Sequence, residues 1–205
     1  MESKKLTRKE QASLTKQKLF ENAICLFKEK GYDSTTVSEI CFKSGVSKGT
    51  FYVHYESKED IIRESYYFNL GAYIENEFND YINQTPNISV VDKIIKFLTL
   101  ELDFTSKTGY ELTCLAYITN LSSCITSKNQ HFQRRVFSEE LKNLLDEAYK
   151  KNLIKNDLSV EEVFLYLETS VRGMMATWCF SNANFDIKTV GEKYILNILK
   201  SLIKI

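Results

Sequence analysis

Residues 35–58 constrain the fold of this chain more than any other segment, because they carry two helical patterns around one tight break. Thr36 and Glu39 have the spacing of a capping box, which marks the start of a helix. Gly45 can adopt the left-handed conformation that ends a helix, and Ser47 can cap the next one. The segment therefore predicts a helix-turn-helix, with a surface helical hairpin as the alternative interpretation.

The second of these helices has a composition that favours DNA binding over core packing. Most of its residues are small, polar or basic, and Gly49 near the helix start costs about 1 kcal/mol relative to alanine. We expect a partner to approach the backbone closely there, as DNA does when a recognition helix enters its major groove. Phe51 and Tyr55 lie on the opposite helix face and are predicted to be core residues.

The order of residues in this region is also informative. It begins with Gly31-Tyr32, Thr35-Thr36-Val37 and Ile40, continues with Gly45-Val46-Ser47-Lys48-Gly49-Thr50-Phe51-Tyr52, and ends with His54-Tyr55-Glu56-Ser57-Lys58-Glu59. Over residues 8–70 the chain closely resembles the DNA-binding domain of TetR-family transcriptional regulators; the rest resembles that family only in length and helical layout. The resemblance implies a homodimeric, sequence-specific regulator that binds double-stranded DNA at an inverted-repeat operator.

The predicted DNA contacts fall into two kinds. Direct base readout is expected from the exposed side chains of the second helix and from its start. The resemblance implies phosphate contacts from flanking residues, which position a protein without specifying sequence. Val53 stands where the family often has a larger residue, so the operator cannot be inferred. The expected base-reading residues are Ser47, Lys48, Gly49, Thr50 and Tyr52, and the expected phosphate contacts are Thr36, His54 and Lys58.

Composition and charge favour a helical protein with a basic end. Hydrophobic residues make up 43% of the 205, and one proline with seven glycines favours long helices. Residues 1–58 carry 11 Lys/Arg and 7 Asp/Glu (net +4), whereas residues 59–205 carry 16 and 20 (net −4). This asymmetry fits a DNA-reading end. No signal peptide or transmembrane pattern is visible, so we expect a cytoplasmic protein without membrane association.

The chain offers little for catalysis or metal binding. Its five cysteines show no CxxC spacing and are interpreted as reduced structural thiols, with redox sensing as the alternative. Two histidines and the lack of any phosphate-binding glycine loop or nucleophile motif give no basis for a metal, a cofactor or an enzymatic activity.

Helical periodicity throughout predicts an all-α fold of about nine helices. We expect a helix-turn-helix DNA-binding domain in residues 1–56 and a ligand-binding and dimerisation domain in residues 57–205. The expected helices cover about residues 8–30, 36–44 and 47–55, and then 57–84, 89–105, 110–126, 129–151, 159–180 and 187–204.

The last two predicted helices are apolar on more than one side, which means that they need partners on two sides. Gly173 within the first of them would allow another helix to approach closely. The resemblance implies that residues 159–180 and 187–204 pair with their symmetry mates in a four-helix dimer interface. Burial of both helices inside a monomer is the alternative.

The predicted body also offers a set of large, adaptable side chains that suits a small lipophilic or aromatic effector, neutral or cationic. We therefore expect a homodimeric repressor that this effector releases from its operator. Packing in an ordinary core is the alternative for each of them. A DNA-bound adaptor whose body binds a protein, without a small effector, is the alternative function. The candidate ligand-binding residues are Phe97, Phe104, Tyr110, Tyr117, Phe137, Met174, Met175 and Trp178.

Overall fold

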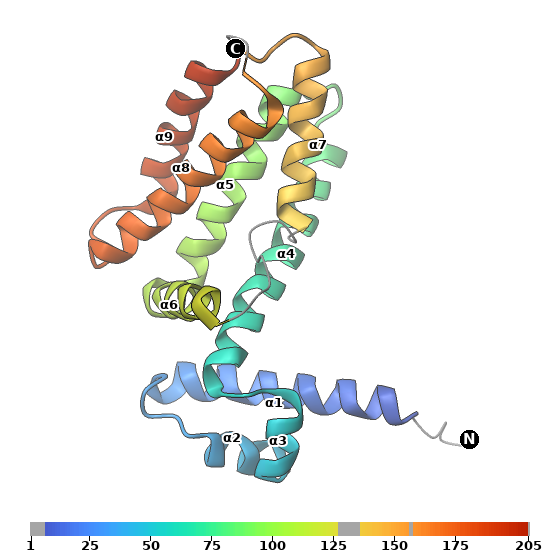
Figure 1. Cartoon of the computed structure of the whole chain (residues 1–205), viewed down its shortest axis with the longest axis vertical. Helices are drawn as coiled ribbons and strands as arrows, with labels where there is room; N and C mark the ends of the chain where they lie inside the picture. Colours follow the sequence, from blue (N-terminus) through green and yellow to red (C-terminus); the bar gives the residue numbers. More distant parts are fainter. Residues whose placement is uncertain (1–6, 127–135, 156–157, 205) are drawn as a thin grey trace. The chain divides into compact units, whose positions relative to one another are not determined.

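The computed structural model describes residues 7–126, 136–155 and 158–204. Among these residues there are nine α-helices and no strand, apart from one isolated antiparallel bridge between Ile154 and Ile203. The all-α prediction is therefore confirmed (Figure 1). The chain divides between Ser65 and Tyr66 into two compact units, here called the head and the body.

The helices begin and end close to the predicted positions. The predicted start of the 129–151 helix lies outside the described residues. The head contains α1 (Arg8–Lys30), α2 (Val37–Ser44), α3 (Lys48–His54) and the first turns of α4 (Lys58–Gln84). The body contains the rest of α4, α5 (Val90–Thr108), α6 (Tyr110–Thr126), α7 (Val136–Lys150), α8 (Val160–Phe180) and α9 (Ile187–Leu202).

Local signals explain these boundaries. The Thr7, Thr36 and Ser159 side chains each cap a helix and form a complete capping box with a glutamate three residues later. Gly45 follows α2 with φ 66° and ψ 35°, the left-handed conformation expected from the sequence. Such signals depend only on neighbouring residues, which is why the sequence alone locates them.

The head has a small core built from three helices and the start of the fourth. Leu19, Ala23 and Phe27 of α1 are buried, as are Ile40 of α2 and Phe51 of α3. Ile61 and Ile62 of α4 are also buried, and the compact unit extends to Ser65. The predicted boundary at residues 56/57 and the functions assigned to the two domains stay predictions.

The body is organised around α5, which packs against α6, α7, α8 and α9. Figure 1 shows α8 and α9 lying side by side along α5. Gly191 allows the close approach of α9, because a Cβ there would lie 2.2 Å from Leu102 Cδ1. Within the described parts of the chain, no helix is long and apolar enough to cross a membrane.

Candidate nucleic-acid interface and body groove

Helix α3 separates a buried face from an exposed one. Phe51 is fully buried, and its ring centroid lies 5.8 Å from that of Tyr55, which is also buried. Both were predicted as core residues, and both predictions are confirmed. On the other face Tyr52 is 57% exposed, and Lys48 is exposed as well. The seven-residue helix therefore presents polar groups outward from an apolar anchor.

The start of α3 has a hydrogen-bonded cap and no large side chain. The Ser47 hydroxyl accepts a hydrogen bond from the Thr50 backbone N–H at 3.1 Å and lies 2.9 Å from the Thr50 hydroxyl. A Cβ added at Gly49 would lie 3.6 Å from Ser47 Oγ, an ordinary contact. No steric contact within the described residues requires glycine at this position.

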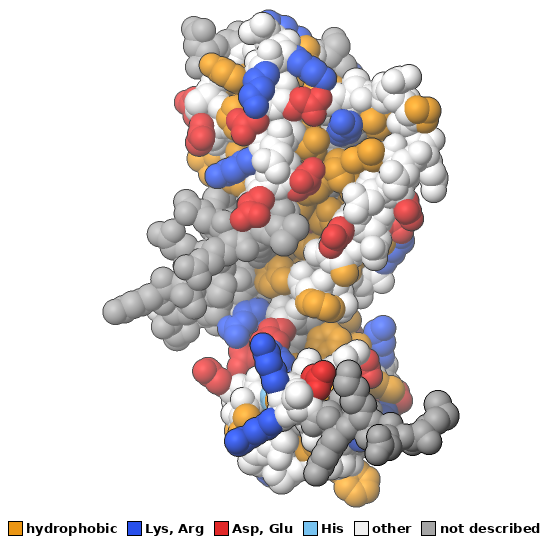
Figure 2. Space-filling model, turned by 90° about the vertical axis from the view of Figure 1, so that its right-hand side faces the viewer, with side chains coloured by type: hydrophobic (Ala, Val, Ile, Leu, Met, Phe, Trp, Pro, Cys, Tyr) orange, Lys and Arg blue, Asp and Glu red, His pale blue; other side chains and the backbone are white. Residues whose placement is uncertain are grey.

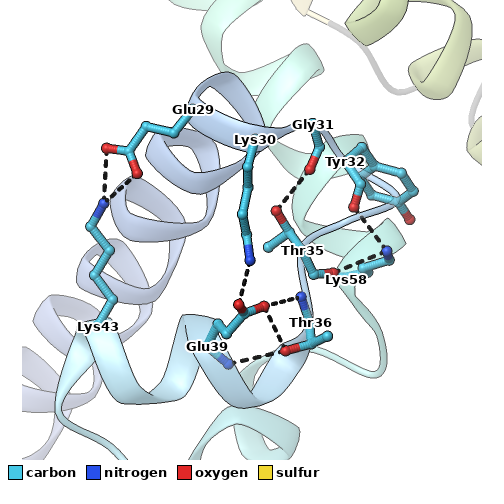
Figure 3. A network of polar contacts seen from close by, with 9 residues as sticks. All are labelled: Glu29, Lys30, Gly31, Tyr32, Thr35, Thr36, Glu39, Lys43 and Lys58. Atoms are coloured by element: carbon cyan, nitrogen blue, oxygen red, sulfur yellow. Dashed lines mark hydrogen bonds and ion pairs between the residues drawn. The ribbon is translucent and has the colours of Figure 1, made fainter.

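The start of α2 contains a polar network that Figure 3 shows from close by. The Thr36 hydroxyl donates to Glu39 Oε2 at 2.8 Å and accepts from the Glu39 backbone N–H at 3.3 Å. Lys30 pairs with the same carboxylate. The hydrogen bond from Lys30, followed by those from Thr36, lowers the pKa of Glu39 to about 2. Thr36, a predicted phosphate contact, is exposed and also serves as the helix cap.

Lys58, another predicted phosphate contact, bonds within the head. Its ammonium donates to the carbonyls of Tyr32 at 3.0 Å and Thr35 at 3.2 Å, and lies 4.1 Å from the centre of the Tyr32 ring (Figure 3). The Tyr32 hydroxyl donates to Glu59 at 2.6 Å. Burial first, and then this bond to Glu59, raise the pKa of Tyr32. Lys58 thus fastens the α1–α2 loop to α4, and its phosphate contact stays a prediction.

The remaining head surface is mixed in charge. Basic and acidic side chains both show on the space-filling view (Figure 2). Lys43 pairs with Glu29 at 3.2 Å and Lys16 with Glu64 at 2.7 Å. No ion pair among the described residues includes Lys48. His54, the third predicted phosphate contact, is half-buried at the end of α3.

One exposed feature of the head was not predicted. Phe42 on α2 is 89% exposed, next to the well-buried Cys41. Its position outside the apolar spacing of Val37, Ile40 and Cys41 is the sequence signal that could have identified it.

The body contains a groove of about 240 Å³ between α4, α5 and α7. Two of the predicted ligand-binding residues, Phe97 and Phe137, lie in it with their ring centroids 4.6 Å apart. Sequence reasoning missed the rest, although the α4 members share the spacing of one helix face. The other lining residues are Gly71, Ile74, Glu75, Phe78, Asn79 and Ile82 of α4 and Glu140 of α7.

The other predicted ligand-binding residues do not line this groove. Phe104 packs between Tyr66 and Tyr73, with ring centroids at 5.3 and 5.6 Å. Met175 is buried and Met174 half-buried. The remaining three residues lie between α6 and α8. The ring centroids of Tyr110 and Trp178 are 6.0 Å apart, and the Tyr117 hydroxyl donates to the Arg172 carbonyl at 3.1 Å. The structure therefore distributes the set over several packing sites.

A cluster of buried polar groups lies elsewhere in the body. Glu101 and Glu168 are both buried, and Arg172 donates through Nε to Glu168 Oε2. Burial acts to lower the pKa of Arg172, but the charge and hydrogen bond of Glu168 together with the charge of Glu101 outweigh it, so the pKa is raised. Glu168 Oε1 is buried without a hydrogen-bond partner among the described residues. Buried charge of this kind has to be held by accurate packing.

Three comparisons place this geometry among known proteins. Residues 19–64 match the family described as bacterial regulatory proteins, tetR family, and residues 119–204 match the C-terminal region of the MAATS-type transcriptional repressors. The biofilm operon icaADBC negative transcriptional regulator IcaR of Staphylococcus epidermidis is 40% identical over 88 residues, covering 40% of this chain and less than half (43%) of that protein.

Two longer matches have lower identity. The transcriptional regulator AcrR of Shigella flexneri is 24% identical over 198 residues, covering 94% of this chain and 91% of that protein. The crystal structure of FadR from Bacillus subtilis in complex with stearoyl-CoA has a TM-score of 0.54 at 19% identity, covering 89% of this chain and 96% of that one. At this identity the structural match concerns the fold alone.

Proposed function

Since the chain belongs to the TetR family of bacterial transcriptional regulators, we propose that it is a DNA-binding repressor that reads its operator with α3. The observation that carries this proposal is the two-sided nature of α3, in which Phe51 anchors the helix while Lys48 and Tyr52 face outward. Bare backbone at Gly49 allows close approach to a base edge.

The test begins with an operator selected from random duplexes and compares two tyrosines of equal exposure. Tyr52→Ala should weaken binding to the selected duplex by about 1–3 kcal/mol, as loss of a base contact does. Tyr149→Ala is the matched control, because Tyr149 in the body is 58% exposed against 57% for Tyr52. Equal affinities of the two variants in fluorescence anisotropy would contradict the assignment of α3.

The role of Lys58 can be separated by salt dependence. If Lys58 contacts a phosphate, Lys58→Met should reduce the slope of log K against log salt by about one unit. If its bonds to the Tyr32 and Thr35 carbonyls are its main role, affinity should fall with the slope unchanged. The first outcome supports the predicted phosphate contact, and the second replaces it with a positioning role.

We further propose a C2 homodimer formed by α8 and α9, which would read an inverted-repeat operator. The support is apolar exposure on both helices, at Leu165, Tyr166 and Tyr194. A Cβ at Gly173 would meet no atom within 4 Å, so the surface is open there. Gly173→Arg should give a monomer by light scattering, whereas Glu139→Arg on the exposed surface of α7 should not. A monomeric native protein at micromolar concentration would overturn this proposal.

The body is proposed to bind a small lipophilic or aromatic effector that lowers DNA affinity. The groove between α4, α5 and α7 supports this, and α4 also extends into the head, so a shift of α4 would affect both units. A tenfold loss of operator affinity needs a preference of about 1.4 kcal/mol for the DNA-incompetent state. A ligand that binds the body without changing operator affinity would exclude this model for that ligand.

One observation favours the second candidate function, a DNA-bound adaptor whose body binds a protein. Ile118, Leu121 and Ile125 project from α6 at helical spacing and are all exposed. Leu121→Lys and Ile125→Lys should abolish binding of such a partner but leave effector binding in the groove unchanged. The two candidate functions therefore predict separate sets of sensitive residues.

A further inference from the structure

The groove between α4, α5 and α7 combines aromatic rings with carboxylates. The ring centroid of Phe97 lies 5.1 Å from that of Phe78 and 4.6 Å from that of Phe137. Glu75 and Glu140 belong to the same lining. None of the nine lining residues is basic. Among the described residues, the groove thus joins apolar surface to two negative charges without a compensating cation in its lining.

Two basic side chains close to this lining in sequence each lie against an aromatic ring outside it. Lys96 precedes Phe97 in α5, but its ammonium lies 5.3 Å from the centre of the Tyr81 ring. Lys142 follows Glu140 by two residues in α7, and its ammonium lies 4.9 Å from the centre of the Phe164 ring. Neither residue belongs to the lining, so the negative charge of the groove is available to a ligand.

Gly71 gives the groove open space on its α4 side. A Cβ built at Gly71 would meet no atom within 4 Å, and the backbone there has no positive φ. A larger residue at this position can therefore occupy the groove without distorting the helix. Figure 2 shows that hydrophobic side chains also reach the surface of the body, between polar and charged ones.

A cation is attracted both by the aromatic rings and by the carboxylates of this lining. Aromatic faces attract cations through their quadrupole, and carboxylates attract them directly, whereas an anion is repelled by the carboxylates. We propose that the groove binds a small lipophilic cation, of the aryl- or alkylammonium class, in preference to acyl-CoA thioesters. This inference rests on the proposed effector-binding function of the body and specifies the class of ligand.

The size of the groove sets a limit on the ligand. Its volume of about 240 Å³ lies below the roughly 300–1,000 Å³ of sites for drug-sized ligands. It can hold one aromatic ring with a short charged substituent. The B. subtilis FadR structure contains stearoyl-CoA, which is far larger and carries several negative phosphates. The lining described here offers no basic side chain to neutralise such phosphates.

The experiment uses the full chain and four probes in isothermal titration calorimetry: benzyltrimethylammonium, its neutral isostere neopentylbenzene, the anion 4-phenylbutanoate, and lauroyl-CoA. The cation should bind at least about tenfold more tightly than the neutral or anionic probe. Glu75→Gln and Glu140→Gln should each weaken the cation by roughly fivefold and leave the neutral probe unchanged. Glu77→Gln, an exposed α4 residue outside the lining, is the matched control.

Gly71→Leu should abolish binding of the cation and the neutral probe alike by filling the groove, with the unfolding temperature unchanged or raised.

Tighter binding of lauroyl-CoA than of the cation would overturn the inference. A cation that binds in the groove but leaves operator affinity unchanged would support the ligand class and contradict the effector role. No binding of any probe, with operator binding intact, would overturn the ligand class alone.

Discussion

The head and the body differ in where the carboxylates of their ion pairs lie. In the head, Glu29 and Glu39 lie at the surface near helix ends and pair with lysines. In the body, Glu168 is only 2% exposed and is held by Arg172, with Glu101 buried nearby. The head therefore pairs its exposed charges between α1 and α2, whereas the body holds a buried carboxylate with an arginine one turn later on the same helix, α8.

This difference separates two uses of charge. Exposed ion pairs contribute about 0–1 kcal/mol, because water and salt screen them and holding two long side chains in place costs entropy. A buried carboxylate depends on its partner, because removing that partner leaves an uncompensated charge in a poorly solvated place. We infer that the head can lose a charge of its exposed pairs without unfolding and that the body cannot lose the charge that compensates buried Glu168 at so small a cost.

The largest expected effect is on the buried pair. Arg172→Met should reduce the free energy of unfolding by about 3 kcal/mol, because it leaves Glu168 charged and unpaired. Lys43→Met, which breaks the exposed pair with Glu29, should cost less than about 1 kcal/mol. Urea unfolding followed by circular dichroism at one protein concentration measures both. Equal losses for the two variants would remove the distinction between the units.

Gly191 in the body and Gly49 in the head should respond differently to substitution by alanine. Gly191→Ala places a Cβ 2.2 Å from Leu102 Cδ1, so α9 and α5 must separate or the leucine must leave its position. We expect a loss of about 1–3 kcal/mol, the usual cost of overpacking a core. Leu102→Ala combined with Gly191→Ala should behave non-additively, because the smaller residue makes room for the new methyl group. Strict additivity of the two changes would contradict this reading of the contact.

The glycine in the head should show the reverse pattern. Gly49→Ala meets only an ordinary contact with Ser47 Oγ at 3.6 Å, so stability should be unchanged or rise by up to about 1 kcal/mol. Operator affinity should fall by roughly tenfold or more, about 1.4 kcal/mol, if DNA approaches the backbone there. Unfolding and anisotropy measurements on one preparation test both. Unchanged DNA affinity would mean that Gly49 has no part in the interface.

The sequence predicts the head better than the body for a physical reason. Thr36 with Glu39, and Gly45 after α2, are local signals whose partners lie within a few residues. The resemblance adds the expected role of α3, and the burial of Phe51 follows from helical spacing. These parts of the fold need no information about distant contacts, so a single sequence contains them.

The groove and the buried charges depend on contacts far along the chain. The ring of Phe97 meets that of Phe137 forty positions later, and no local pattern shows that pairing. Glu101 and Glu168 read as solvent-facing residues in a helical pattern, because charged side chains are rarely buried. Their burial is decided by tertiary packing, which is why the predicted ligand set included only two residues of the groove.

The smallest expected effect concerns two carboxylates that have a similar pKa for different reasons. The pKa of Glu39 in the head is about 2, lowered by hydrogen bonds from Lys30 and Thr36. The pKa of Asp103 in the body is also about 2, although burial acts to raise it, because the hydrogen bonds from Tyr73, Lys188 and Lys107 together outweigh that burial.

The pKa of each of these two carboxylates in the folded state lies below its ordinary value. Each therefore contributes stability above about pH 4–5 that is lost as the pH falls towards 2. In a titration followed by carboxyl NMR, Lys30→Met should raise the pKa of Glu39 clearly, because it removes the strongest of the bonds that lower it, while the bonds from Thr36 remain. Lys107→Met should raise the pKa of Asp103 only in part, because Lys188 still donates to it at 2.9 Å. If Lys107→Met restored Asp103 as fully as Lys30→Met restores Glu39, the carboxylates of head and body would be supported alike, and the contrast between the two units would be confined to the buried pair.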